Sequence, residues 1–165
     1  MRNFRVSDES GHQEAIFSWC RGRYPELKLL YHVPNGGKRD AATARALKRQ
    51  GVKDGISDLV LPVASAGYHG LYVELKAPGG SLEQSQADFL QAVEQQGYLA
   101  LVCVGWQAAV QTLSAYLDGA EPEAQPLKTK STPKEGTYYL ALKTMREGMK
   151  RAAEYADQDT LLPAT

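Results

Sequence analysis

The stretch that decides the fold runs from Gly55 to Lys76 and reads GISDLVLPVASAGYHGLYVELK. Its second half predicts a strand whose successive side chains point to opposite faces of a sheet. Tyr72, Glu74 and Lys76 therefore share one face, at a spacing of ~6.6 Å between neighbours on that face. The residues between them are apolar and predict a core on the other face.

A second carboxylate stands just ahead of a neighbouring strand. Asp58 precedes the apolar run 59–61, and a turn signal at residues 65–67 joins this run to the strand of Glu74. An antiparallel hairpin would place Asp58 beside Glu74. Two adjacent carboxylates repel unless a proton or a cation intervenes, and Mg²⁺ accepts oxygen ligands from such pairs. The pattern predicts a metal site for phosphodiester hydrolysis, in which Lys76 orients the attacking water or stabilises transition-state charge.

Each of these residues also has a plainer interpretation when it is taken alone. Asp58 is typical of an aspartate that accepts hydrogen bonds from loop amides at the start of a strand. Glu74 is typical of an exposed residue that is ion-paired with Lys76 on a solvated sheet face. The combination of all three favours a functional site.

Length and composition limit what else the chain can hold. With 165 residues, of which 43% are hydrophobic, it can bury one good core and is too short for two ordinary domains. Nineteen basic residues balance nineteen acidic ones, so a nucleic-acid partner would need a local basic surface. Cys20 and Cys103 lack CxxC spacing, and the sequence has no apolar run of signal or membrane length. We therefore expect a reduced, cytoplasmic protein without a membrane segment.

Hydrophobic periodicity predicts helices that alternate with strands, in a mixed α/β core of four strands with helices on both faces. The site would lie on the exposed face of the central hairpin. We expect one domain over residues 1–119. Residues 120–137 have the proline-rich, polar composition of a linker, and residues 138–165 regain helical spacing as a C-terminal tail.

These residues resemble a known family. Asp58 followed by Glu74-x-Lys76 has the form of the PD-(D/E)xK nuclease signature, and the flanking sequences GISDL and ELKAPGG closely resemble its VRR-NUC branch in a stand-alone, phage-like form. Ser57 replaces the proline of the signature and leaves the ligand in place. The resemblance covers roughly residues 12–116. It implies a restriction-endonuclease-like core and an endonuclease that uses Mg²⁺ or Mn²⁺ on DNA, typically branched DNA such as Holliday junctions, as a symmetric homodimer.

The resemblance also implies that a glutamine of the next helix belongs to the active site. Two glutamines are candidates. Gln84 is explained by a capping box with Ser81, whereas Gln86 shares a stripe with Phe89 that should face the sheet. We therefore predict that Gln86 is the active-site glutamine.

Further site residues follow from the resemblance alone. It implies Glu14 of the first helix as another metal ligand and the carbonyl of Leu75 as an extra one. It also implies that the loop carrying Asn35, Lys38 and Arg39 contacts nucleic acid. The plainer interpretations are a first-turn acid favoured by the helix dipole and a solvated basic turn.

Two other functions are compatible with the sequence. The first is a catalytically idle DNA-binding or assembly module that retains the fold, and the intact set of Asp58, Glu74 and Lys76 argues against it. The second is a small-molecule phosphohydrolase, which would require a closed pocket in place of an open basic groove.

Overall fold

The computed structural model describes residues 8–34, 40–127 and 134–140. Its helices are α1 (Glu9–Cys20), α2 (Ala41–Arg49), α3 (Gln84–Glu94) and α4 (Trp106–Leu117), with a short 3₁₀ helix η1 (Pro25–Leu29). Its strands are β1 (Tyr31–His32), β2 (Leu59–Leu61), β3 (Leu71–Lys76), β4 (Leu99–Val104), β5 (Gln125–Leu127) and β6 (Gly136–Leu140). None of the helices in these ranges is long and apolar enough to cross a membrane.

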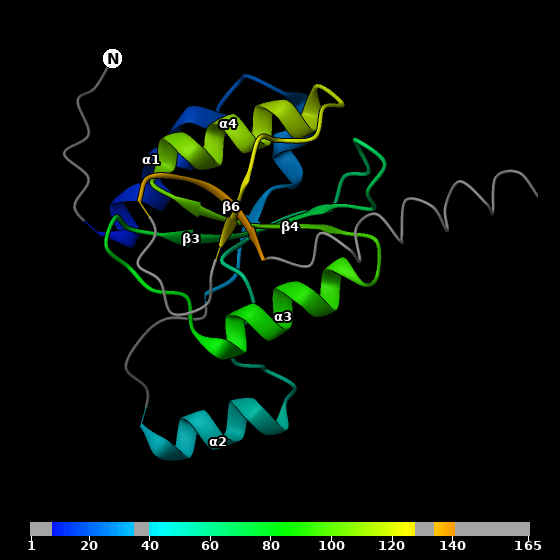
Figure 1. The fold of residues 1–165 in the computed structure, drawn as a ribbon. Coiled ribbons are helices and arrows are strands. Elements are labelled where there is room, and N and C mark those ends of the chain that lie inside the picture. Colours follow the sequence, from blue (N-terminus) through cyan, green and yellow to red (C-terminus); the bar gives the residue numbers. More distant parts are fainter. Residues whose placement is uncertain (1–7, 35–39, 128–133, 141–165) are drawn as a thin grey trace, which may run out of the picture.

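The strands form one mixed sheet in the order β1-β2-β3-β4-β6-β5. The central strands β3 and β4 are parallel, and β2 pairs antiparallel with both β1 and β3. Helices α1 and α4 cover one face of the sheet, and α3 covers the other (Figure 1). The predicted α/β class with helices on both faces is confirmed, although the sheet has six strands where the sequence predicted four.

The two additional strands lie where a linker and a helical tail were predicted. β5 falls inside the predicted linker 120–137, and β6 extends into the predicted tail 138–165. Pairing of β6 with β4 buries Leu140, while Leu127 is buried on β5, so long-range contacts override the polar local composition. Pro126 is tolerated because β5 is an edge strand. The rest of the tail, from residue 141, lies outside the described residues.

Apolar side chains fill both sides of the sheet. One layer, under α1 and α4, includes Ile16, Leu75 and Leu113, and a second layer, under α3, includes Leu90 and Val102. The face that carries Glu74 and Lys76 is therefore covered by a helix. The prediction of an exposed site face is wrong for this reason, since both side chains are buried.

The predicted hairpin of β2 and β3 is confirmed. Leu59 pairs with Val73 in an antiparallel register, and continuing this register by one residue places Asp58 opposite Glu74. A bridge between Ser65 and Tyr68 closes the connection. Hairpin register thus brings together two carboxylates that are sixteen positions apart in the sequence.

The first turn of α4 is capped by a residue from α1. Gly105 stands at the N-cap and offers no side chain, and the ring Nδ1 of His12 accepts a hydrogen bond from the Trp106 N–H at 3.1 Å. His12 is buried, and burial lowers its pKa, although the negative charges of nearby carboxylates act to raise it. A neutral imidazole can accept this bond, so His12 joins α1 to α4.

The segment that leads into β2 packs tightly against α3. Gly55 has a φ of +79°, and a Cβ atom at this position would collide with the backbone carbonyl group of Ser85. Both the conformation and the close approach require glycine. Gly55 therefore fixes the chain just before Asp58 against the first turn of α3.

Replacing this glycine should destabilise the fold strongly. Gly55→Ala combines a left-handed strain of about 1–2 kcal/mol with an overpacking cost of about 1–3 kcal/mol. Gly51→Ala is the matched control, because Gly51 also has a positive φ but has no atom within 4 Å of the added methyl group. Urea unfolding should show the larger loss for Gly55→Ala. Equal losses would contradict the close approach at Gly55.

Candidate active site

Glu74 stands at the centre of the site and is fully buried. Its Oε1 accepts hydrogen bonds from Lys76 Nζ, at 2.9 Å, and from Gln86 Nε2. Its Oε2 is buried and accepts no hydrogen bond from the residues that the structure describes. One oxygen of the carboxylate is therefore held by Lys76 and Gln86, while the other lacks a donor in this part of the chain.

Asp58 is held beside Glu74 by the backbone of β3. Its Oδ2 accepts a hydrogen bond from the Leu75 N–H at 2.9 Å, and its own carbonyl accepts one from the Val33 N–H at 2.8 Å. Burial raises the pKa of Asp58, against the lowering effects of the Leu75 hydrogen bond and the charge of Lys76. Asp58 thus satisfies a backbone amide and also lies opposite Glu74.

Lys76 is enclosed by carboxylates. Only 9% of its side chain is exposed, and Nζ lies 2.9 Å from Glu74 and 3.6 Å from the Glu9 carboxylate of α1. Burial lowers the pKa of Lys76, but the negative charges of Glu74, Glu9 and Asp58 together outweigh burial and raise it. The lysine therefore carries its positive charge at neutral pH.

The electrostatics of the carboxylate pair suit a divalent cation. Burial, reinforced by the charge of Asp58, raises the pKa of Glu74 to about 8. A cation beside Oε2 would satisfy that atom and offset the repulsion. No group of three or more His, Cys, Asp or Glu residues in the described ranges could hold a metal ion. A pair of carboxylates fits Mg²⁺, which binds through one or two carboxylates and retains waters.

Gln86 lies in the site, although the capping argument that selected it needs correction. The N-cap of α3 is Glu83, and Gln86 completes the capping box by accepting the Glu83 N–H at 3.0 Å through Oε1. Its Nε2 remains free to reach Glu74. Gln84, for which a capping box with Ser81 was predicted, instead donates to Asp88. Gln86 is therefore both a helix cap and a partner of Glu74.

Of the remaining predicted residues, the described Glu14 is not brought into the site. Glu14 is exposed on α1, and within the described part of the chain no contact joins it to the carboxylate pair. The acid of α1 that reaches the site is Glu9, which no local pattern indicated because only the docking of α1 brings it to Lys76. Asn35, Lys38 and Arg39 lie outside the described residues.

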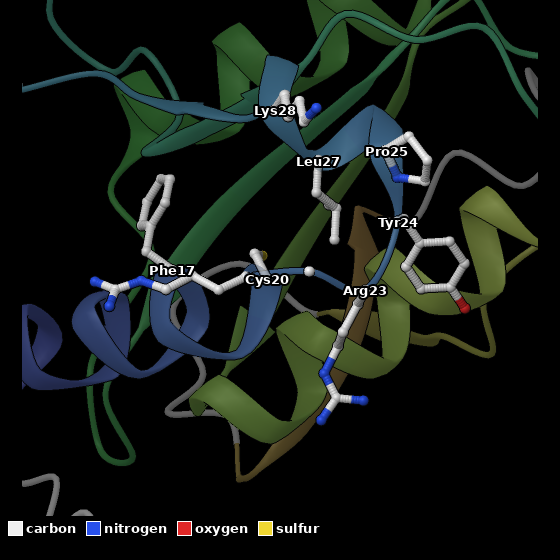
Figure 2. Close-up of a pocket in the computed structure, with 9 residues that line it drawn as sticks. Phe17, Cys20, Arg23, Tyr24, Pro25, Leu27 and Lys28 are labelled. Carbon is white, nitrogen blue, oxygen red and sulfur yellow. The ribbon is translucent and has the colours of Figure 1, made fainter.

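A pocket of about 570 Å³ lies at the other end of α1 and is separate from the carboxylate pair. Figure 2 shows Phe17, Cys20 and Leu27 between the end of α1 and η1. Its charged lining residues are Arg21, Arg23 and Lys28, without an acid. The pocket therefore offers no carboxylate for a metal and is not the candidate active site.

Comparisons with known proteins show the family to which this fold belongs. The family model of the VRR-NUC domain matches residues 7–107. The chain belongs to the VRR-NUC domain family. A solved structure described as a VRR_NUC domain protein is similar with a TM-score of 0.62 and 25% sequence identity, covering 71% of this chain and 93% of that one. No curated protein matches the chain. The VRR-NUC family gives the chain a nuclease fold, with a nucleic acid as the general class of substrate.

The raised pKa of Glu74 predicts how stability depends on pH without metal. Between its ordinary value of 4.5 and about 8, the folded protein binds more protons at Glu74 than the unfolded chain does. The free energy of unfolding should therefore fall as pH rises through this window. Urea unfolding in EDTA across the window measures the slope, and Glu74→Gln should flatten it. Parallel curves for the two proteins would show that Glu74 titrates normally.

Proposed function

We propose that the protein is a metal-dependent endonuclease that hydrolyses phosphodiester bonds in DNA. The observation that carries the proposal is the buried Glu74 carboxylate, which lies beside Asp58 and the charged Lys76 and whose Oε2 accepts no hydrogen bond from the described residues. This arrangement, in a VRR-NUC fold, suits a divalent cation and an anionic substrate.

Each side chain has a separate role in the proposed reaction. Asp58 and Glu74 would hold Mg²⁺ or Mn²⁺, and the Leu75 carbonyl is an additional proposed ligand. When bound, the cation lowers the pKa of a water molecule and offsets phosphate charge. Gln86 acts as a positioning residue, because it fixes Glu74 Oε1 and leaves Oε2 for the cation. Lys76 would orient the attacking water and stabilise the negative charge that develops on the phosphate.

The finer substrate and setting rest on the family resemblance. We propose branched DNA such as a four-way junction as the substrate, cut by a symmetric homodimer that presents two sites to two strands. Both cysteines are free and buried, which is in keeping with a reducing, cytoplasmic setting. A catalytically idle DNA-binding module is the alternative that the activity assay separates.

The purified protein should cut plasmid or junction DNA with Mg²⁺ or Mn²⁺ and should stop cutting in EDTA. Lys76→Ala should lower kcat by about 10²–10³-fold, because it removes a positive charge from the transition state. Gln86→Ala should cost about 10-fold or more by releasing Glu74. Single-turnover cleavage with fluorescent DNA measures both effects.

Lys28→Ala is the control for this assay, because it removes an exposed lysine of η1, which lines the pocket that is separate from the carboxylate pair. The proposed function fails if the wild type leaves plasmid, junction and RNA intact with either metal. The role of Lys76 fails if Lys76→Ala, shown by circular dichroism to be folded, cuts as fast as the wild type.

Mg²⁺ should raise the melting temperature by relieving the repulsion between the two carboxylates. At about 100 times Kd, binding contributes about 2.7 kcal/mol, which shifts Tm by several degrees. Asp58→Asn should reduce this shift, whereas Glu14→Gln should retain it, because Glu14 lies away from the pair. Differential scanning calorimetry with Mg²⁺ or EDTA measures the shift. An equal shift in the wild type and in Asp58→Asn would exclude Asp58 as a ligand.

A further inference from the structure

The chain makes a long excursion between β1 and β2 that begins and ends beside Asp58. The Asp58 carbonyl accepts a hydrogen bond from the Val33 N–H at 2.8 Å and lies 3.1 Å from His32 Nδ1. The chain therefore leaves the sheet beside Asp58, after Val33, and returns to it at Asp58, one residue before β2. Any element within this excursion is therefore joined through the backbone to Asp58, one of the two carboxylates.

The excursion carries α2, which stands apart from the sheet on the side of α3 (Figure 1). Asp40 caps the helix by accepting hydrogen bonds from the N–H groups of Ala42 and Thr43. None of the helix residues is buried. Local capping and helix-favouring residues thus form α2, and its outer surface is available to a partner.

Positive charge is concentrated in this excursion. Six of the nineteen Lys and Arg residues lie between positions 38 and 54, with only two acids, although the whole chain has no net charge. On α2, Arg45, Lys48 and Arg49 are exposed, and Lys48 is paired with Asp54 at 2.6 Å. Arg45 and Arg49 lie one turn apart on one side of the helix, and neither has a carboxylate partner within the described residues.

The chemistry of this surface suits phosphates better than it suits another protein. The exposed face of α2 offers arginines among alanines and contains no aromatic or large apolar residue, whereas protein interfaces are enriched in aromatic anchors. The half-buried Leu47 lies on the opposite side of the helix. Exposed arginines that are not paired with acidic residues can bind the phosphates of a nucleic-acid backbone.

The excursion is also fixed relative to the site. Gly55 packs against the Ser85 backbone and lies next to the amide nitrogen of Gln86, whose side chain bonds Glu74. The return from α2 to β2 therefore rests on the same turn of α3 that positions the carboxylate. A nucleic acid held by α2 would therefore be connected to the site through this short return, which is packed at Gly55.

We propose that α2 is a backbone-binding arm, in which Arg45 and Arg49 contact phosphates of the nucleic acid flanking the scissile bond. The proposal rests on the proposed nuclease function and adds to it a site for substrate binding outside the carboxylate pair. The arm supplies affinity and the carboxylate pair supplies chemistry, so loss of the arm should weaken binding and leave turnover at saturating substrate unchanged.

The test compares full-length Arg45→Ala/Arg49→Ala with the wild type. Alanine favours the helix, so α2 should persist, which circular dichroism checks. Fluorescence anisotropy with a labelled duplex and a four-way junction in EDTA gives the affinity over a range of salt concentrations. We expect roughly ten-fold weaker binding, with a slope of log K against log salt that is smaller by about 2. Cleavage should show a raised KM with kcat unchanged.

Two further variants control for charge. Arg21→Ala/Lys28→Ala removes the same charge from exposed positions at the far end of α1 and should bind like the wild type. Arg45→Lys/Arg49→Lys keeps the charge and should retain most of the salt slope. The proposal is overturned if the double alanine variant keeps the wild-type affinity and slope, as a merely solvated helix face would. It is also overturned if the control at the end of α1 loses as much.

The two readouts separate this proposal from the proposed function. Suppose that the wild type cuts DNA and that the double alanine variant has the same KM and salt slope as the wild type. The proposed role of α2 is then wrong, and the nuclease function stands. If the wild type cuts no nucleic acid but its binding depends on Arg45 and Arg49, the nuclease function fails and the arm stands as a binding surface.

Discussion

A fully buried carboxylate is the constraint on which the rest of this structure depends. Removing an isolated carboxylate from water is costly unless it is paired and hydrogen-bonded or takes up a proton. Glu74 meets this cost through Lys76 and Gln86 at one oxygen, whereas the other oxygen accepts no hydrogen bond from the part of the chain that the structure describes. The protein thus maintains an unfavourable arrangement in its core, which is typical of sites where a ligand completes the structure.

Several elements are needed to maintain that arrangement. The register of β2 and β3 sets Asp58 opposite Glu74, the first turn of α3 supplies Gln86, and the N-terminal end of α1 supplies Glu9. Gly55 allows the approach of the chain to α3 that closes the site. Strand pairing, the two helix contacts and the approach at Gly55 therefore position the site, and rigid sheet and helix elements hold it.

How much the sequence could predict depended on how far apart in the chain the interacting residues lie. Strand alternation and the hairpin are local, so Asp58, Glu74 and Lys76 could be placed together without the structure. Gln86 was identified by the stripe of residues on its helix that faces the sheet. The N-cap of this helix is Glu83 and not Ser81, and this cap leaves the amide nitrogen of Gln86 free. The pairing of β6 with β4 depends on contacts across the chain, so local composition suggested a linker where the structure has strands. Docking of α1 likewise brings Glu9, and not the predicted Glu14, to Lys76, and no local pattern in the sequence shows that contact.

The bond from Trp106 to His12 has a consequence for the order in which the protein folds. The first turn of α4 is completed by a side chain that is ninety-four positions away, and Gly105 itself donates its N–H to the carbonyl of Lys76. Docking of α1 therefore places Glu9 next to Lys76 in the same event that caps α4. Contacts between distant positions form slowly because a long loop must first be closed. In kinetic terms, the active-site end of the sheet is therefore completed only once α1 has docked.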